Sequence, residues 1–297
     1  FALAEEARAL VAGLPVEADD FLAQLDVRNV PPRTRCGIAA AWLSARAAAE
    51  GKPLAALIGD THADAVPVNG LVTEKTPEEA AARAASLMAQ GYRTLKVKCW
   101  DDRATDLARV AAIRAAAPGA ELRLDANEAW HGGWALDHVR DLARYDLDYI
   151  EQPIPSSHPM AEIAAFRRAS PVRTALDESA TDAASLEAIL SAGAADVIIL
   201  KTQRAGGPDR AAAMIRSARD AGVQVTVTVS LESAIGTTVA LHVAATLPQP
   251  IPDCGIPMGR FLAADLGPMP SVELGAIMRL PRATPGLGLT PYDRTTP

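Results

Sequence analysis

The stretch Val197-Ile198-Ile199-Leu200, which leads into Lys201, decides the fold. Consecutive aliphatic residues that are mostly β-branched are typical of a strand buried on both faces in a parallel sheet. Other β-rich runs share this character at regular intervals. The predicted strands are 66–72, 94–99, 121–126, 148–152, 172–177, 196–202, 224–230 and 253–258. Their starts lie 24 to 29 residues apart, which is room for one strand, one helix and two short loops.

The segments between the predicted strands are rich in Ala, Arg and Leu and have helical spacing, as in residues 77–90, 101–116 and 209–221. Eight alternating units predict an α/β fold, a (β/α)8 TIM-like barrel, which takes roughly 200 to 250 residues. The competing architecture is a doubly wound open sheet. We favour the barrel because eight even repeats would make an unusually long open sheet.

Two segments lie outside the predicted barrel of residues 66–258. Residues 1–65 contain two helical patterns, over residues 3–11 and 34–50, with Pro31 and Pro32 between them. Residues 259–297 are rich in Pro and Gly and have no long periodic run, so we expect this tail to pack across another element.

The composition excludes several classes of protein. The chain has 297 residues, of which 49% are hydrophobic, so it is too apolar for disorder and long enough for one large core or two domains. The net charge of -7 argues against a nucleic-acid partner. The three cysteines are odd in number and far apart, which indicates a reducing, cytoplasmic location. The sequence shows no pattern typical of a leader or a membrane span, and the oligomeric state stays open, a homo-oligomer included.

Polar residues gather at the C-terminal ends of the predicted strands, where barrel enzymes carry their chemistry. They are Lys96, Lys98, Asp125, Asn127, Glu151, Asp177, Glu178, Lys201, Ser230 and Glu232. A single such residue is more often a solvated loop residue or a salt-bridge partner, but here they recur strand after strand. Lysines and carboxylates at one barrel mouth would neutralise each other. The carboxylates would also suit a hard divalent ion such as Mg²⁺, with room left for a substrate's own carboxylate.

Other catalytic motifs are missing from the sequence. It contains no Gly-x-Ser-x-Gly elbow and no P-loop, and its histidines have no zinc-ligand spacing. Cys99 should point away from the face that carries Lys98, so we expect a packed thiol there.

The motif set resembles the enolase superfamily, and more narrowly its muconate-lactonizing-enzyme subgroup. The residues that carry the resemblance are Leu95-Lys96-Val97-Lys98, Arg123-Leu124-Asp125-Ala126-Asn127, Tyr149-Ile150-Glu151-Gln152-Pro153, Ala175-Leu176-Asp177-Glu178-Ser179, and Lys201 with Gly206-Gly207. The resemblance implies removal of a proton α to a carboxylate, with Mg²⁺ stabilising the ene-diolate and Mn²⁺ as an alternative metal.

The resemblance also implies a role for each residue. Asp125, Glu151 and Asp177 match the metal ligands. Lys98 matches one acid/base, with Lys96 lowering its pKa by like-charge repulsion, and Lys201 matches the lysine on the opposite face. Arg123 would support substrate binding and Ser230 would lie near a succinyl group, as in o-succinylbenzoate synthases. The remaining supporting positions are Asn127, Glu178 and Glu232.

Several reactions share this machinery. The run Arg123–Asn127 with Trp130, and Ser230–Ser233 with Gly236, look most like o-succinylbenzoate synthases, which act in menaquinone synthesis on a small-molecule carboxylate. Racemisation of N-acylamino acids, epimerisation of dipeptides and cycloisomerisation of muconate stay open. The dipeptide reading is weakened because the eighth strand lacks an Asp-x-Asp pair. A barrel that binds without catalysis would predict a broken set of carboxylates and lysines, and this set is intact.

The resemblance bears on the two outer segments as well. Members of the superfamily carry a small α+β capping domain built from an N-terminal sheet, the helices that follow it and the C-terminal tail. We therefore expect residues 1–65 and 259–297 to form a partial cap around the barrel of residues 66–258. We expect the N-terminal sheet of that cap to be missing from residues 1–65.

Overall fold

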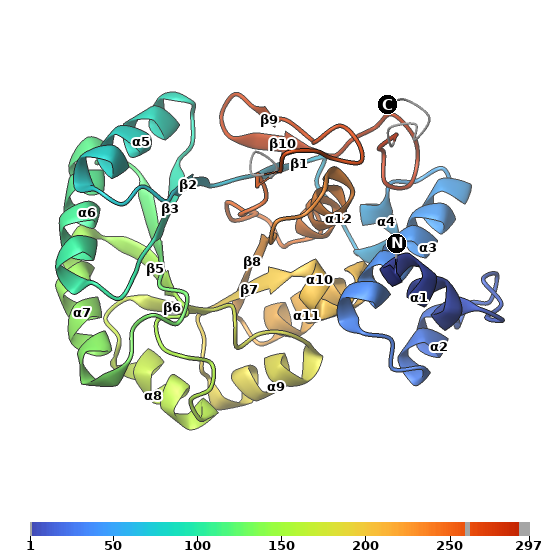
Figure 1. Ribbon diagram of the computed structural model, residues 1–297, viewed down its shortest axis with the longest axis horizontal. Helices are drawn as coiled ribbons and strands as arrows, with labels where there is room; N and C mark the ends of the chain where they lie inside the picture. The colour runs from blue at the N-terminus through green and yellow to red at the C-terminus, as the bar shows by residue number, and fades with distance from the viewer. Residues whose placement is uncertain (1, 259–261, 291–297) are drawn as a thin grey trace.

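The computed structural model describes residues 2–258 and 262–290, and its centre is a curled sheet of parallel strands. The strands pair in chain order, each with the next (Figure 1). They are β2 (Gly70–Val72), β3 (Thr94–Lys98), β4 (Glu121–Asp125), β5 (Leu147–Glu151), β6 (Arg173–Leu176), β7 (Val197–Lys201) and β8 (Gln224–Thr228). The predicted α/β barrel is confirmed, with strand bounds within a residue or two for β3 to β7.

Helices cover the outside of this sheet. They are α5 (Pro77–Ala89), α6 (Arg103–Ala116), α7 (Ala135–Leu142), α8 (Met160–Ala169), α9 (Ala183–Ala192), α10 (Thr202–Ala205), α11 (Pro208–Asp220) and α12 (Ala234–Ala244), with short 3₁₀ turns η1 (Gly132–Trp134) and η2 (Ala143–Tyr145). Local signals set their ends. Asp182 and Ser185 form a capping box that begins α9, and Gly193 ends it in the left-handed conformation.

The ring closes through a short seam in place of an eighth full strand. Cys254 bridges to Val68, and Gly255 bridges to Thr228. Cys254 N donates to Pro67 O at 2.8 Å and Gly255 N to Val227 O at 3.0 Å. The predicted strand 253–258 is therefore wrong in extent, because Pro252 and Pro257 cannot donate to a ladder on either side of this pair.

The first predicted strand, 66–72, is two strands. β1 (Ala65–Pro67) pairs antiparallel with β10 (Ile277–Arg279), which pairs with β9 (Val272–Glu273), so the chain leaves this small sheet before it enters the barrel at β2. The β9–β10 hairpin was not predicted. Its turn contains Gly275 at φ 86°, and a glycine with positive φ in a short loop is typical of a β-hairpin.

Alternation along the strands separates two environments. Side chains that point outward, such as Val97, Leu124 and Ile198, belong to the main hydrophobic core against the helices. Side chains that point into the barrel include a small apolar layer of Tyr149, Ala175, Val197 and Ile199. The polar residues at the barrel mouth lie two positions further along these strands, on the same inward face.

The N-terminal helices α1 (Ala2–Val11), α2 (Phe21–Val27), α3 (Pro32–Ala49) and α4 (Leu54–Ile58) lie together beside α10, α11 and α12 (Figure 1). Arg35 of α3 is buried, donates to Gly206 O at 2.8 Å, and pairs with Asp209 at 2.8 Å. Gly286 of the tail exchanges backbone hydrogen bonds with Lys52 and Leu54 at 2.7 Å. These contacts join the N-terminal helices to both the barrel and the tail.

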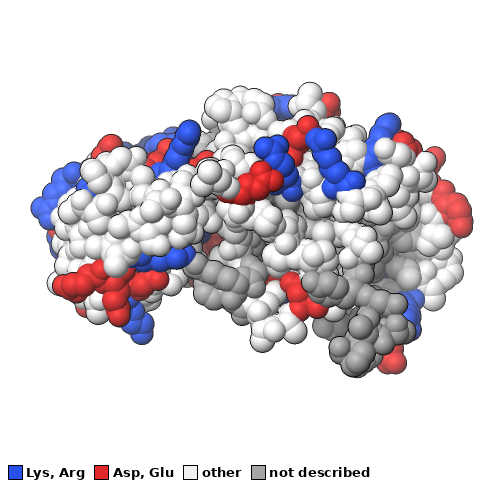
Figure 2. Space-filling model, turned by 90° about the horizontal axis from the view of Figure 1, so that it is seen from above, with Lys and Arg blue, Asp and Glu red and all other residues white. Residues whose placement is uncertain are grey.

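The surface and the helices bear on the expected partners. The face shown in Figure 2 has small groups of basic and acidic side chains on a largely uncharged surface, and its described residues form no continuous basic stripe. No helix within the described residues is both long and apolar enough to span a membrane.

Candidate active site

The residues expected at the barrel mouth come together at the C-terminal ends of β3 to β7. Lys96 and Lys98 lie two apart on β3, Asp125 ends β4, Glu151 ends β5, and Asp177 follows β6, with Lys201 at the end of β7. The ladder pairs Lys98 with Asp125 and Asp125 with Glu151, so three carboxylates on neighbouring strands lie between Lys98 on one side and Lys201 on the other.

Lys96 joins the two carboxylates nearest to it. Its Nζ lies 2.8 Å from Asp125 Oδ2 and 2.7 Å from Glu151 Oε1, and all three side chains are buried. Burial alone would lower the pKa of Lys96, but Asp125 and Glu151 outweigh burial and raise that pKa well above its ordinary value. Lys96 is therefore held as a cation inside the site.

Lys98 is the most open of the three lysines. Its side chain is 30% exposed, against 11% for Lys96 and 16% for Lys201. Its Nζ lies 2.6 Å from both Asp125 Oδ2 and Asn127 Oδ1. Asn127 Nδ2 donates in turn to Glu178 Oε1 at 3.2 Å, which connects two further residues that the sequence singled out.

Lys201 contacts a different carboxylate. Its Nζ donates to Asp177 Oδ2 at 2.5 Å. Arg204, one turn further along α10, donates to Asp177 O at 2.8 Å and places Nη2 3.1 Å from Asp177 Oδ1. Arg204 was not among the residues predicted for the site, although it lies only three residues after Lys201.

A second missed residue is Gln152. Its Oε1 accepts hydrogen bonds from the backbone N–H groups of Asp177 and Ser179, both at 3.1 Å, and the side chain is fully buried. Gln152 has φ 38° and Asn127 has φ 45°, so the chain turns into the left-handed region directly after β5 and again after β4. Non-glycine residues rarely adopt this conformation, and such strain is concentrated at functional sites.

Of the two candidates after β8, only Glu232 is buried. Burial raises its pKa, while Gln203 and Lys201 act in the opposite direction, so Glu232 lies within electrostatic reach of Lys201. Its Oε1 has no hydrogen-bond partner among the described residues. Ser230 is exposed beside it.

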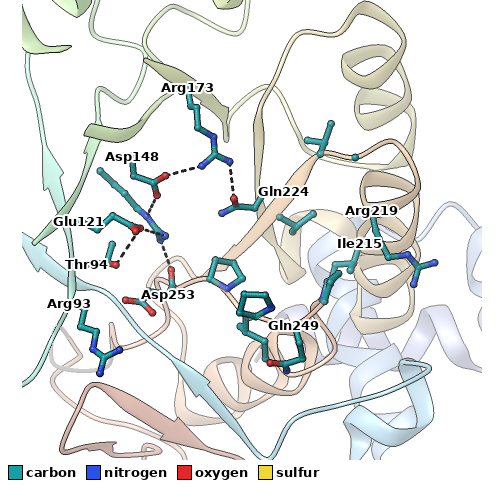
Figure 3. Close-up of a pocket in the computed structure, with 18 of the residues that line it drawn as sticks. Arg93, Thr94, Glu121, Asp148, Arg173, Ile215, Arg219, Gln224, Gln249 and Asp253 are labelled. Atoms are coloured by element: carbon teal, nitrogen blue, oxygen red, sulfur yellow. Dashed lines mark hydrogen bonds and ion pairs between the residues drawn. The ribbon is translucent and has the colours of Figure 1, made fainter. Parts of the chain in front are cut away.

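Arg123 lies away from these residues, at the opposite end of the barrel. Its Nε is 2.8 Å from Asp148 Oδ2 and its Nη2 is 3.0 Å from Glu121 Oε1, and its guanidinium carbon lies 4.9 Å from the Tyr149 ring centroid. These groups border a cavity of about 800 Å³ at the N-terminal ends of the strands. In Figure 3, Asp148 is linked in turn to Arg173, and Arg173 to Gln224.

The mouth itself contains a cavity of about 90 Å³. Its lining includes the charged groups of Lys96, Lys98, Asp125 and Lys201, and also Val229, Gly255, Pro257 and Met258, which lie directly after β8 and at or beside the seam. This volume is far below the roughly 300 to 1,000 Å³ of ordinary ligand pockets, because lysine side chains and carboxylates fill the space by contacting one another.

The chemistry of the mouth fits a hard divalent cation. Glu151 Oε2 and Asp177 Oδ1 are buried and accept no hydrogen bond from any described residue; Arg204 Nη2 lies 3.1 Å from Asp177 Oδ1 without forming one. Burial and Asp125 raise the pKa of Glu151 to about 8, which an added positive charge would reverse. Among the described residues no three His, Cys, Asp or Glu side chains already form a cage; ammonium groups contact the carboxylates instead.

The fold and this arrangement agree with the comparisons to known proteins. A family model for enolase C-terminal domain-like proteins matches residues 79–295. The chain therefore belongs to the enolase superfamily and is an enzyme of that superfamily.

The relatives of similar sequence are o-succinylbenzoate synthases, and one solved structure of similar fold is a dipeptide epimerase. The o-succinylbenzoate synthase of Thermobifida fusca (strain YX) is 36% identical over 223 residues, which cover 74% of this chain and 68% of the relative. That of Mycobacterium ulcerans (strain Agy99) is 34% identical over 258 residues, covering 83% and 72%. Among solved structures, a dipeptide epimerase from Enterococcus faecalis V583, complexed with Mg and the dipeptide L-Leu-L-Tyr, is similar at TM-score 0.88 and 25% identity, covering 97% of this chain and 82% of that one.

Proposed function

We propose that this enzyme eliminates water from a hydroxylated cyclohexadiene carboxylate to form o-succinylbenzoate, in menaquinone synthesis. The observation that carries the proposal is the pair Lys98 and Lys201, which end strands on two sides of the mouth and contact different carboxylates, Asp125 and Asp177. The synthases at 34% and 36% identity support this choice of reaction.

The residues of the chain account for each proton. Lys98 Nζ, as the free amine, takes the proton α to the substrate carboxylate, and the C–H electron pair becomes the new C=C bond. Lys98 then returns that proton to the departing hydroxide, which leaves as water when the C–O bond breaks. The product ring is aromatic, which favours this second step. The Lys201 ammonium stabilises the ring's negative charge from the other face.

Asp125, Glu151 and Asp177 would hold a Mg²⁺ ion, which would supply positive charge to the substrate carboxylate as the proton leaves. Lys96 keeps a permanent positive charge between Asp125 and Glu151, so two of these carboxylates stay oriented whether or not substrate is present. A largely dry mouth strengthens all of these interactions.

Single lysine variants test the proposal. Lys98→Ala removes the group that moves the proton, so we expect kcat to fall by roughly 10³-fold or more, with Mg²⁺ binding retained. Lys75→Ala, at an exposed lysine three residues beyond β2, is the matched control and should leave turnover unchanged. Formation of o-succinylbenzoate, followed by absorbance with and without EDTA, measures the effect. Turnover by Lys98→Ala at the control's rate would refute the assignment.

A second candidate is racemisation or epimerisation of an acylated amino acid or dipeptide. It is favoured by the same two lysines on separate carboxylates and by the fold's similarity to dipeptide epimerases. Incubating N-succinylamino acids in D₂O distinguishes the two functions. A racemase incorporates deuterium and loses optical rotation without eliminating water, whereas the proposed lyase forms o-succinylbenzoate at a much higher kcat/KM.

A further inference from the structure

A buried guanidinium supports the end of β3 from outside the barrel. Arg109 on α6 is 0% exposed. Its Nη1 donates to Lys98 O and its Nε to Glu74 O, each at 2.8 Å. Arg109 therefore contacts the backbone of Lys98 while the Lys98 side chain points into the mouth.

The position of Arg109 matches a gap in the sheet. β2 ends at Val72, whose ladder partner is Val97, so the two strands stop pairing one residue before Lys98. Beyond that pair, the two-pronged Arg109 side chain spans from the loop after β2 to the last residue of β3. A planar guanidinium with several fixed donors can bridge two carbonyls in this way, whereas an ammonium group cannot reproduce the fork.

Asp106 and Trp100 extend this support to the residues after Lys98. Asp106, also 0% exposed, lies 3.3 Å from Arg109 Nη1 and accepts a hydrogen bond from Trp100 N at 3.2 Å. The Arg109 guanidinium lies 4.2 Å from the Trp100 ring centroid. Trp130 Nε1 donates to Trp100 O at 3.1 Å. The backbone groups Lys98 O, Trp100 N and Trp100 O are thus held by side chains outside the barrel.

We infer that Arg109, with Asp106, is the positioning pair for the Lys98 base, an inference that rests on the proposed function for its chemical consequence. Lys98 is the last residue of β3: on the β4 side the ladder continues through Cys99 N to Asp125 O at 2.8 Å, and on the β2 side, where the ladder has stopped, Arg109 holds the Lys98 carbonyl. The fork sets the direction of the Lys98 side chain and so brings Nζ to Asp125 and Asn127. A displacement of about 1 Å in a reacting group can slow a reaction roughly 100-fold.

The energetics of the pair favour a role beyond simple packing. Arg109 and Asp106 are an ion pair without exposure to water, and Arg109 Nη2 has no hydrogen-bond partner among the described residues. Buried ion pairs are often no more stabilising than apolar side chains of the same size, so stability alone does not explain this pair. Its directional bonds go to the two carbonyls that flank the end of the base's strand.

The chain offers a matched control on the same helix. Arg114 of α6 also donates to backbone carbonyls, those of Ala120 at 2.6 Å and Tyr145 at 3.0 Å, but at the opposite end of the barrel. Arg109→Lys and Arg114→Lys therefore make the same chemical change, one behind Lys98 and one far from it. A third variant combines Asp106→Asn with Arg109→Met and removes both buried charges together, so neither charge is left unpaired. This double variant tests the inference if Arg109→Lys folds poorly.

The test measures kcat, KM and the isotope effect for substrate deuterated at the α-carbon. If Arg109 positions Lys98, Arg109→Lys and the double variant lower kcat at least tenfold, change KM less than about threefold, and increase the isotope effect because proton removal becomes slower. Arg114→Lys keeps the wild-type kcat and isotope effect. Folded Arg109 variants with wild-type kcat and isotope effect would overturn the inference, as would equal losses in Arg114→Lys.

A crystal structure of Arg109→Lys separates this inference from the proposed function. If wild-type enzyme turns over none of the tested substrates, the proposed reaction fails, and positioning is judged from the structure alone. The inference then requires that Lys98 Nζ moves away from Asp125 Oδ2, which it contacts at 2.6 Å in the native chain. An unmoved Lys98 side chain with an unmoved backbone would refute the positioning role.

Discussion

Replacing Arg123 by Met tests whether this residue stabilises the barrel or binds substrate. Arg123 is 2% exposed and donates to three acceptors at the N-terminal end of the barrel: Asp148, Glu121 and the carbonyl of Asp253. None of these groups lies at the mouth. We therefore expect Arg123→Met to destabilise the fold while the KM of the folded enzyme stays unchanged.

The magnitude follows from the burial of the network. Removing one partner of a buried ion pair costs about 3 to 5 kcal/mol, because the other charge is left uncompensated. Asp148 keeps its contact with Arg173 at 2.9 Å, which places the loss near the lower limit. About 3 kcal/mol corresponds to a decrease in the melting temperature of roughly 5 °C for a chain of this size.

Arg173→Met is the matched control for this measurement. Its side chain is 43% exposed and pairs with the same Asp148, so we expect its removal to cost at most about 1 kcal/mol. Thermal unfolding followed by circular dichroism gives both values, and initial rates give KM. The reasoning would be refuted if Arg123→Met melted no earlier than Arg173→Met. An increase in KM with unchanged stability would instead return Arg123 to the substrate site.

Three further predictions concern pH, backbone strain and metal. His242 bonds to Leu287 O, and burial lowers the pKa of its imidazole from 6.5 to about 4. Between these two values the folded state binds fewer protons than the unfolded state, so about 3 kcal/mol of stability is lost as the pH falls through this window. In urea unfolding at pH 7 and pH 4.5, His242→Gln should therefore lose less stability on acidification than the native enzyme. Gly207→Ala should cost roughly 2 kcal/mol in urea unfolding, because φ is 141° and a Cβ would lie 3.1 Å from Arg35 Nη1. Saturating Mg²⁺, at about 100 times its Kd, should raise the melting temperature by roughly 4 °C in the native enzyme but not in Asp177→Asn; an equal increase in both would exclude Asp177 as a ligand.

The barrel could be predicted from the sequence because each repeating unit of the fold requires a fixed pattern of residues. Each unit needs an apolar strand, a helix and two short loops, so strands such as 197–201 are visible from composition and spacing alone. The seam at Cys254 and Gly255 was overestimated because apolar residues continue on both sides of it. Prolines that cannot donate hydrogen bonds ended the pairing there.

The candidate site was predictable to the extent that strand ends determine it. The lysines and carboxylates of β3 to β7 converge as the alternation of side chains requires. Arg123 did not join them, because its guanidinium extends toward Asp148 and Glu121 at the N-terminal end of the barrel, whereas Lys96, its ladder partner at the same depth, extends toward the carboxylates of the mouth. Gln152 and Arg204 were missed because their roles depend on backbone turns and on a helix start that hydrophobic patterns do not reveal.

The seam that closes the barrel affects how the substrate specificity of such an enzyme can change during evolution. The backbone between β8 and β2 is joined by isolated bridges, whereas every other neighbour in the ring shares a ladder. Residues directly after the seam, Pro257 and Met258, border the mouth cavity. This part of the wall can therefore be lengthened, shortened or resequenced without disturbing a strand register, while the lysines and carboxylates across the mouth stay fixed. Changes that adapt the pocket to a substrate of different shape therefore disturb the fold least at the seam, which contributes none of the lysines and carboxylates.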